Sequence, residues 1–315
     1  MNIRPSEGKL YCLTGTTGFL GGAFLQHLIG RNLRCLAMNR PRLNQAGANV
    51  IGNGHGIIED ISNWSCRVLE VRPSFLFSFD WSGVHSKARN NQELQQSNYD
   101  RIMRLAESAL EVKSELFVTF GSQAEVASSL CLIKEDQSDY PLDAYGRWKV
   151  RLRQDLEKLF AGSSTRFVWC RVFTVYGSGD TRNSFINSKI MSMMKNESLT
   201  ISNPNNLWSI LHVSDFVQAL DKILNADSIT GTVNIGSSFV TTVSEVAEVV
   251  TRIFQGQSLE KIAPRFLSEL NQLSWIPDTS YLESVGWNQK TVMTEGLRDT
   301  ISWWRKSMNL ELETE

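Results

Sequence analysis

A glycine-rich segment near the N-terminus places the strongest limit on what this chain can fold into. Residues 9–13 form a short strand-like apolar run, and the segment 14–22 (TGTTGFLGG) follows directly. Glycines between a strand and a helix let the backbone approach a pyrophosphate, and the free N–H groups at the helix N-terminus can hold it. The segment therefore predicts a dinucleotide site at the first strand–helix turn. The residues with helical spacing after it are Phe24, Leu25, Leu28 and Ile29.

Strand-like and helix-like patterns alternate over roughly the first 175 residues. Apolar residues at helical spacing predict two longer helices around 99–110 and 145–160. The alternation predicts an α/β fold, a Rossmann-type doubly wound parallel sheet flanked by helices. The predicted strands are 10–14, 33–38, 56–59, 74–79, 116–121 and 167–173.

The pattern becomes looser after Gly179. Stretches rich in Asn and Ser at 183–187 and 203–206, and a mixed region around 258–290, interrupt the alternation. A chain of 315 residues can form one large domain or a domain with a smaller lobe. We therefore predict a dinucleotide-binding Rossmann domain at 1–178 that also receives roughly 208–255, and a smaller C-terminal substrate lobe mainly from 179–207 and 256–315.

Two residues one helical turn apart form a candidate proton-transfer pair. Tyr145 and Lys149 lie in the segment 143–149 (DAYGRWK), so their side chains share one face of a helix. A nearby ammonium favours a phenolate, and we expect Lys149 to lower the pKa of Tyr145 from its usual value near ~10. This spacing also occurs on ordinary polar helix faces, so the glycine segment upstream is what favours a catalytic role.

Composition argues against a nucleic-acid-binding protein, a membrane protein and a metal site. The formal net charge of −1 gives no electrostatic reason to expect nucleic acid or a membrane surface as a partner. No signal-like apolar core stands at the start, and no run approaches the ~20 residues of a membrane helix. Four histidines without clustered carboxylates predict no metal site. Five scattered cysteines indicate a reducing compartment, and we expect a cytoplasmic protein: Cys12, Cys35, Cys66, Cys131 and Cys170.

Short motifs continue along the chain after the glycine segment and the Tyr145/Lys149 pair. They are Asp60-Ile61, Asn98-Tyr99 at the expected start of a helix, 171–177 (RVFTVYG), 212–215 (HVSD), 233–236 (VNIG), 284–287 (SVGW), 295–298 (EGLR) and Ser302-Trp303. In order and spacing they resemble the extended short-chain dehydrogenase/reductase family, in its nucleotide-sugar epimerase, dehydratase and reductase branch. The resemblance spans almost the whole chain.

The resemblance implies a nicotinamide enzyme and assigns roles to matching residues. Tyr145 would exchange a proton with a sugar hydroxyl or ketone, Lys149 would hold the ribose, and Ser122 would bind the reacting oxygen. Donors directed at that oxygen stabilise the charge that develops as hydride reaches the carbon. The implied cofactor-binding residues are Gly15, Thr17, Gly18, Phe19, Leu20, Asn39, Arg40, Asp60, Ile61, Phe79, Asn98, Tyr145, Lys149 and Val172.

The residues after the second predicted strand bear on the choice of cofactor. A carboxylate there binds the adenosine ribose of NAD, whereas an arginine accommodates the 2′-phosphate of NADP. The segment 39–42 (NRPR) has no acid and two arginines. We therefore predict NADP(H), with Arg40 as the phosphate contact, and keep NAD(H) as the alternative in which Arg40 and Arg42 are ordinary surface charges.

The residues next to Ser122 argue against dehydration and decarboxylation and leave oxidoreduction or 4-epimerization as the expected reaction. Dehydratases of this branch have an Asp-Glu pair at the place of Gln123-Ala124, decarboxylases have a glutamate at Ala124, and bifunctional epimerase-reductases have a cysteine near it. The segments 80–84 (DWSGV) and 121–125 (GSQAE) resemble abequose-synthase-type reductases, although Val126 replaces their tyrosine.

The leading hypothesis is NADPH-dependent reduction of the 4-keto group of a nucleotide-linked deoxysugar, with CDP as the expected nucleotide. An NAD-dependent nucleotide-sugar 4-epimerase is the alternative, and a catalytically silent dinucleotide-sensing protein is a third reading. The apolar faces of 99–110 and 145–160 predict a homodimer through these helices.

The substrate side is less defined. Many relatives have a phosphate-binding arginine four residues before His212, where this chain has Trp208. Phosphate contacts would then come from Arg182, Lys189 or Lys195, or the substrate is not a nucleotide sugar. We predict His212 to be a packing residue. The predicted substrate-binding residues are Trp81, Gln123, Arg182 and Asn183.

Overall fold

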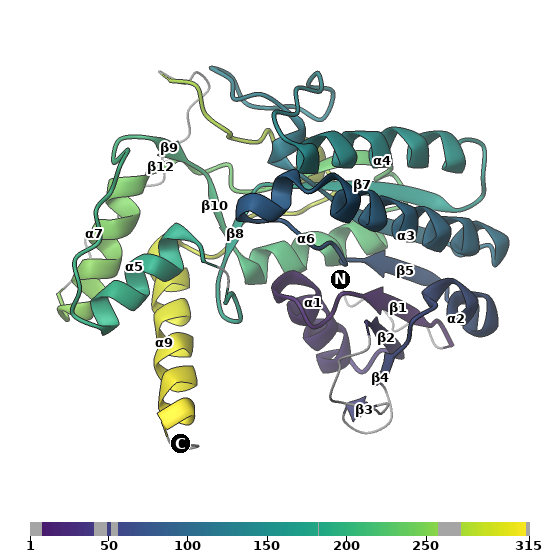
Figure 1. Cartoon of the computed structure of the whole chain (residues 1–315), viewed down its shortest axis with the longest axis horizontal. Coiled ribbons are helices and arrows are strands. Elements are labelled where there is room, and N and C mark those ends of the chain that lie inside the picture. The colour runs from purple at the N-terminus through teal and green to yellow at the C-terminus, as the bar shows by residue number, and fades with distance from the viewer. Residues whose placement is uncertain (1–7, 41–48, 52–55, 182, 258–271, 313–315) are drawn as a thin grey trace. The chain divides into compact units, whose positions relative to one another are not determined.

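The computed structural model describes residues 8–40, 49–51, 56–181, 183–257 and 272–312 (Figure 1). Contacts between residues divide the chain into two units. The first contains 1–127, 136–171 and 223–233, and the second contains 128–135, 172–222 and 234–315. These bounds differ from the predicted domains, since 128–135, 172–178, 208–222 and 234–255 belong to the second unit.

An eight-stranded sheet forms the centre of the first unit, in the order β11-β7-β6-β5-β1-β2-β4-β3. Strands β4, β2, β1, β5 and β6 pair in parallel, as predicted. The edge strand β3 pairs antiparallel with β4 and was not predicted. The strands are β1 (Tyr11–Thr14), β2 (Cys35–Asn39), β3 (Asn49–Ile51), β4 (Gly56–Asp60), β5 (Phe75–Ser78), β6 (Leu116–Ser122), β7 (Arg166–Val172) and β11 (Gly231–Ile235).

Helices cover both faces of this sheet because neighbouring strand residues point to opposite sides. On β5, Leu76 packs in a core with α2 (Trp64–Val71), α3 (Gln92–Glu111) and α4 (Ala144–Phe160). The next residue, Phe77, contacts Phe24 of α1 (Phe19–Gly30) on the other face, with ring centroids 4.8 Å apart. The Rossmann-type doubly wound sheet predicted from the sequence is confirmed.

The glycine segment forms the turn between β1 and α1. Gly15 has a φ of 71°, which favours glycine, and a Cβ there would lie 2.7 Å from the backbone nitrogen of Asp80. Gly18 precedes the first residue of α1, and its N–H donates to the Gly15 carbonyl at 3.1 Å. The turn therefore brings the start of α1 next to the residues that follow β5, at the carboxyl ends of neighbouring strands.

The second unit has its own core. Apolar residues of α5 (Phe185–Met194), α7 (Val243–Phe254) and α9 (Met293–Leu312) pack together with Ile210. Short strands pair as β8 (Thr174–Tyr176) with β10 (Ile210–His212) and as β9 (Leu207–Trp208) with β12 (Thr241–Thr242). The remaining α-helices of the described ranges are α6 (Val213–Asn225) and the short α8 (Ser280–Glu283).

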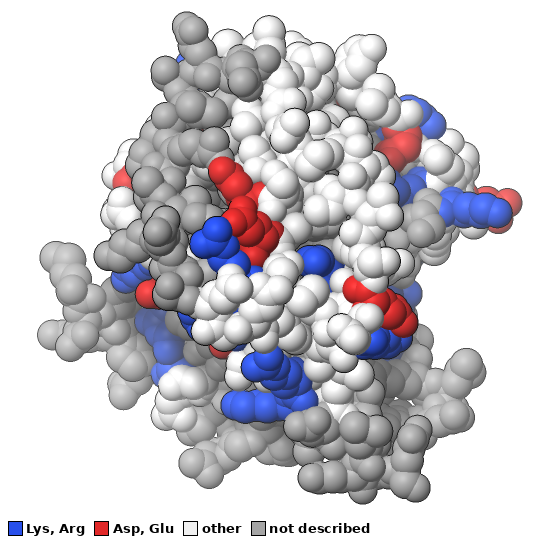
Figure 2. All heavy atoms as spheres, turned by 90° about the vertical axis from the view of Figure 1, so that its left-hand side faces the viewer, with Lys and Arg blue, Asp and Glu red and all other residues white. Residues whose placement is uncertain are grey.

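Charged side chains are mixed on the visible surface. On the face in Figure 2, small groups of Lys and Arg and small groups of Asp and Glu lie among uncharged residues, as a net charge of −1 leads one to expect. Of the helices in the described ranges, none combines the length and the apolar character that a membrane span requires.

Candidate active site

Helix α4 carries the predicted Tyr145/Lys149 pair near its N-terminus. Asp143 caps the helix, since its Oδ1 accepts from the Gly146 N–H at 2.7 Å. Tyr145 is 7% and Lys149 3% exposed. Lys149 Nζ donates to the carbonyl oxygen of Phe120 on β6 at 2.6 Å. The structure thus ties the pair to the strand that ends in Ser122.

Ser122 is held by a capping box around the 3-10 helix η2 (Gln123–Glu125). Its Oγ accepts from the Ala124 N–H at 3.2 Å, and its own N–H donates to Glu125 Oε1 at 2.6 Å. A hydrogen bond between the side chains of Ser122 and Tyr145 favours the phenolate. Ser122, Tyr145 and Lys149 therefore come together as predicted, in the first unit.

Glu125, which the sequence prediction did not include, places a buried carboxyl group beside Ser122. Its carboxylate is fully buried and accepts from Trp169 Nε1 at 3.1 Å and from Arg171 Nε at 3.4 Å. Burial raises the pKa of Glu125, and the nearby Arg171 and Arg153 act in the opposite direction. Because Ser122-x-x-Glu125 matches the sequence pattern of a capping box, the sequence does contain a signal for it.

The expected effect of Lys149 on Tyr145 is not what the structure shows. Burial raises the pKa of Tyr145 to about 12, and the contributions that lower it come from Ser122 and Arg89. Burial also lowers the pKa of Lys149 to about 7, against the attraction of Glu125 and Asp80. Desolvation of both groups outweighs the helical spacing on which the prediction rested.

Trp81 lies directly against the pair. The Nζ of Lys149 is 3.6 Å from the Trp81 ring centroid, within the range of a cation–π contact. The Trp81 ring meets the Tyr145 ring edge-on at 6.1 Å, and its Nε1 donates to Gln95 Oε1 at 2.7 Å. Trp81 is therefore a wall of the candidate site.

The end of β2 presents hydrogen-bond donors. Asn39 Oδ1 accepts from the N–H and the hydroxyl of Thr16, each at 3.1 Å, and its buried Nδ2 has no hydrogen-bond partner among the described residues. Arg40 is 55% exposed, with Nη2 3.1 Å from Asp80 Oδ1. Arg101 also binds Asp80, at 2.7 Å. Two guanidinium groups thus share one carboxylate beside the glycine turn.

Asn98 does not open a helix as expected. It lies within α3, whose cap is Asn91 through a bond from the Leu94 N–H. The buried Asn98 amide instead accepts from the N–H of Ser82 at 3.1 Å and donates to its carbonyl at 2.8 Å. Asn98 therefore fixes the backbone next to Trp81.

The remaining predicted cofactor residues surround the carboxyl ends of the strands. Ile61 follows β4 and its N–H donates to the Asn39 carbonyl at 3.1 Å. Phe79 follows β5 and stacks on Phe120 at 4.1 Å. Asp60 ends β4, though its side chain lies outside the described residues. The others are Thr17 in the glycine turn, Phe19 and Leu20 at the start of α1, and Val172 at the end of β7.

The predicted substrate residues fall in different places. Gln123 begins η2 beside Ser122, in the first unit. Asn183 belongs to the second unit, where its Oδ1 accepts from Ser188 Oγ at 3.0 Å. Arg182 and Arg42 lie outside the described residues. Trp208, at the place of the missing arginine, packs edge-on against Phe185 and donates to Thr174 Oγ1 at 3.2 Å.

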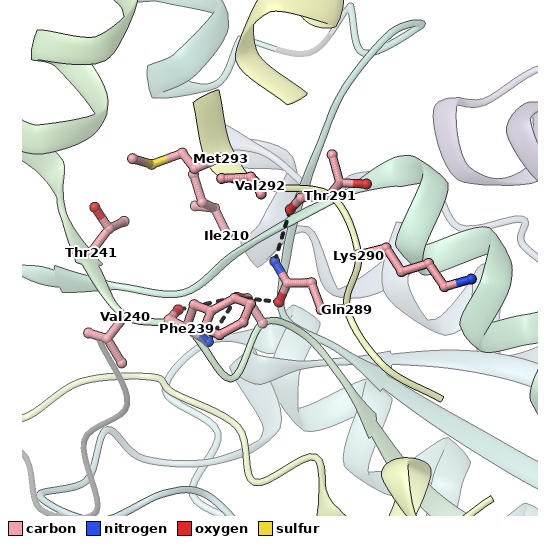
Figure 3. A pocket seen from close by; sticks show the side chains of 10 residues that line it. Ile210, Phe239, Val240, Thr241, Gln289, Lys290, Thr291, Val292 and Met293 are labelled. Atoms are coloured by element: carbon pink, nitrogen blue, oxygen red, sulfur yellow. Dashed lines mark hydrogen bonds between the residues drawn. The ribbon is translucent and has the colours of Figure 1, made fainter. Parts of the chain in front are cut away.

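A cavity of about 200 Å³ lies within the second unit (Figure 3). Its wall includes Gln289, whose Oε1 accepts from Ser237 Oγ at 2.7 Å. The sequence prediction did not include this cavity, because its wall comes from three separate segments of the chain and has no motif. The other lining residues are mostly apolar: Ile210, Phe239, Val240, Thr241, Lys290, Thr291, Val292 and Met293.

Comparison with known proteins places these features in context. The family model described as the NAD dependent epimerase/dehydratase family matches residues 11–236. A curated trifunctional UDP-glucose 4,6-dehydratase/UDP-4-keto-6-deoxy-D-glucose 3,5-epimerase/UDP-4-keto-L-rhamnose-reductase of Arabidopsis thaliana is 25% identical over 134 residues, 42% of this chain. The match spans only 20% of that relative's length.

Solved structures share the fold over nearly the whole chain. MoeE5 in complex with UDP-glucose and NAD has a TM-score of 0.78 and 22% identity, and covers 96% of this chain and 100% of its own. The UDP-glucose 4-epimerase of Thermotoga maritima with UDP-glucose has a TM-score of 0.79 and 18% identity, covering 95% and 99%. With a family model that matches well over half of its length, the chain belongs to the NAD-dependent epimerase/dehydratase family, as its motifs predicted.

Proposed function

We propose that this protein is an NADPH-dependent ketoreductase that reduces the 4-keto group of a nucleotide-linked deoxysugar, with a CDP-linked sugar as the first substrate to test. The observation that carries the proposal is the set of donors at the end of β2. Asn39 offers a buried, unpartnered amide N–H, and Arg40 offers an exposed guanidinium. Donors in this position suit the 2′-phosphate of NADP, whereas the ribose hydroxyls of NAD suit a carboxylate.

The cofactor would bind along the glycine turn of Gly15 and Gly18, where the start of α1 offers N–H groups to the pyrophosphate. When bound, the reduced nicotinamide supplies a hydride to the carbonyl carbon. Tyr145 donates a proton to the carbonyl oxygen, so that ketone and hydride become an alcohol and the oxidised cofactor is released. Lys149, already buried beside Tyr145, holds the ribose.

The surroundings of Ser122 support reduction over elimination. Ser122 is fixed by its capping box next to Tyr145 and can donate to the carbonyl oxygen as charge develops there. The two following residues, Gln123 and Ala124, supply neither an acid nor a base. Loss of water or of CO₂ would need an acid or base in addition to Tyr145, and reduction by hydride transfer does not.

The test is turnover of a CDP-linked 4-keto-6-deoxysugar, followed by the loss of NADPH absorbance. We expect oxidation of NADPH in proportion to product, with NADH less effective at the same concentration. Tyr145→Phe should lower kcat by at least about 10²-fold, the scale of a lost general acid. Full turnover by Tyr145→Phe would contradict the assigned role of Tyr145. A wild type that binds a dinucleotide and turns over no nucleotide-linked sugar would favour a dinucleotide-sensing protein.

An NAD-dependent nucleotide-sugar 4-epimerase is the second candidate. It is supported by the solved relatives described above, which include a UDP-glucose 4-epimerase and a protein in complex with UDP-glucose and NAD. An epimerase removes and returns the hydride, so it keeps its cofactor. Mass and absorbance of the purified protein separate the two candidates: one equivalent of NAD that survives dialysis would favour the epimerase.

A further inference from the structure

A second cation lies on the ring of Tyr145. Arg89 belongs to the 3-10 helix η1 (Ser86–Asn90), and its Cζ is 4.4 Å from the Tyr145 ring centroid. The Nζ of Lys149 is farther from that centroid, at 5.7 Å. Arg89 was not among the predicted site residues, because no motif of the chain includes it. Arg89 and Tyr145 both lie in the first unit.

Arg89 is fixed from two sides. Its Nε donates to Asp143 Oδ2 at 2.6 Å, and its Nη1 donates to the Val84 carbonyl at 3.0 Å. Asp143 is the residue that caps α4, through its other oxygen and the Gly146 N–H. One carboxylate therefore begins the helix that carries Tyr145 and also holds the guanidinium against the Tyr145 ring.

The charges around Tyr145 come from three elements. Arg89 lies on η1, Asp143 and Lys149 lie at the start of α4, and Glu125 lies on η2. Glu125 and Asp143 raise the pKa of Tyr145, whereas Arg89 lowers it. The pKa of Lys149 is lowered to about 7, so Lys149 is only partly charged at neutral pH. A guanidinium keeps its charge at every pH at which the protein works.

We propose that Arg89 is a positioning residue for Tyr145, and that its guanidinium, held by Asp143 and Val84, stabilises the phenolate that Tyr145 forms when it gives up its proton. The inference rests on the role of Tyr145 in the proposed function. In this role Arg89 supplies the permanent positive charge that sequence spacing assigned to Lys149. It acts on the proton of Tyr145 and needs no contact with the sugar.

The test reads the ionisation of Tyr145 without any substrate. Protein labelled with ¹³C at the tyrosine ζ position is titrated between about pH 9.5 and 11, and Tyr145→Phe assigns the signal. A group with a pKa of about 12 is about one tenth ionised at pH 11. Neutral Arg89→Gln and Arg89→Met should raise that pKa by about one unit, which makes the phenolate fraction about tenfold smaller.

Two further variants separate charge from packing. Arg89→Lys keeps the positive charge and should titrate within a few tenths of a unit of the wild type. Lys87→Gln removes one charge from the same short helix at an exposed position and should leave Tyr145 unchanged. Circular dichroism at each pH shows whether the variants are folded. If one of the two neutral variants, Arg89→Gln or Arg89→Met, does not fold, the other still tests the proposal.

The proposal is overturned if the neutral variants titrate like the wild type, or if Arg89→Lys shifts Tyr145 as far as Arg89→Gln does. Because the titration uses the protein alone, a failure to find ketoreductase activity leaves its result intact. An unchanged Tyr145 titration in an active ketoreductase would overturn only the role of Arg89.

Discussion

The ammonium nitrogen of Lys149 lies 3.6 Å from the centroid of the Trp81 ring, and it donates a hydrogen bond to the Phe120 carbonyl at 2.6 Å. Burial under this ring is the reason that the pKa of Lys149 falls to about 7, from an ordinary value of 10.5. A lysine with a lowered pKa in the folded state makes stability depend on pH.

Lys149→Met should reveal this dependence. Between about pH 7 and 10 the unfolded chain binds the proton of Lys149 and the folded protein has lost it, so the free energy of unfolding rises with pH. The wild type should therefore gain about 1 kcal/mol per pH unit relative to Lys149→Met over this range. Urea unfolding at pH 7, 8 and 9 measures it. Lys158→Met, at an exposed position of the same helix, is the control, and parallel curves for wild type and Lys149→Met would contradict the prediction.

Gly121→Ala should destabilise the protein through a steric clash. A Cβ at Gly121 would overlap the indole nitrogen of Trp169 and the carboxylate of Glu125, neither of which has space to withdraw. Overpacking of this kind costs about 1–3 kcal/mol. Gly30→Ala, where a Cβ meets nothing within 4 Å, should leave the thermal midpoint unchanged or raise it. Equal midpoints for both variants would count against the tight packing beneath Ser122.

Glu125→Gln should be among the most destabilising single changes in the first unit. It removes the buried carboxylate that contacts Arg171 and Trp169, and breaking a buried ion pair from one side costs about 3–5 kcal/mol. Glu157→Gln removes a half-exposed partner of Arg153 on the same network and should cost under about 1 kcal/mol. Chemical unfolding of both variants gives the comparison, and similar losses would show that burial of the carboxylate contributes little.

The sequence predicted the parts of this fold that depend on local pattern. The approximate bounds of β1 and β5–β7 follow from the short-range pattern of apolar residues. The turn at Gly15 follows from its positive φ, which favours glycine. The sequence did not predict β3, whose pairing depends on a neighbouring strand. The sequence also predicted that Tyr145 and Lys149 lie one turn apart on the same helix, as they do on α4. The spacing of two residues contains no information on burial, however, and burial determines their pKa values.

Arg89 and Asp80 were not predicted as site residues, and the reason is the same for both. Arg89 and Asp80 act through partners 54 and 21 residues away, at Asp143 and Arg101. No short motif records such a pairing. Glu125 differs, since its partner Ser122 is three residues away and forms a recognised capping pattern. Long-range ion pairs at the site could be found only from the folded chain.

We also predict a homodimer through α3 and α4. Tyr99 and Trp148 bring their rings within 5.4 Å on these helices, and Arg151 lies over both rings at 5.2 and 5.1 Å. A half-exposed aromatic and cationic cluster is typical of interface centres. Trp148→Glu should therefore halve the mass seen by light scattering at micromolar concentration. Lys158→Glu, farther along α4, should not; a monomeric wild type would refute the dimer.

Asn39→Asp tests the cofactor directly. The substitution replaces the Asn39 Nδ2 donor with a second carboxylate oxygen, and this carboxylate would repel a 2′-phosphate and accept ribose hydroxyls. We expect NADP(H) to bind about 10-fold or more weaker and NAD(H) to bind equally or better, because loss of one charge-assisted bond costs about 1.5–3 kcal/mol. Arg40→Gln should weaken NADP(H) alone, and Arg34→Gln, just before the start of β2, should change neither. Calorimetric titration with both cofactors distinguishes these cases. If NAD(H) binds the wild type more tightly than NADP(H), the donors at the end of β2 do not select the phosphate and the epimerase becomes the better proposal.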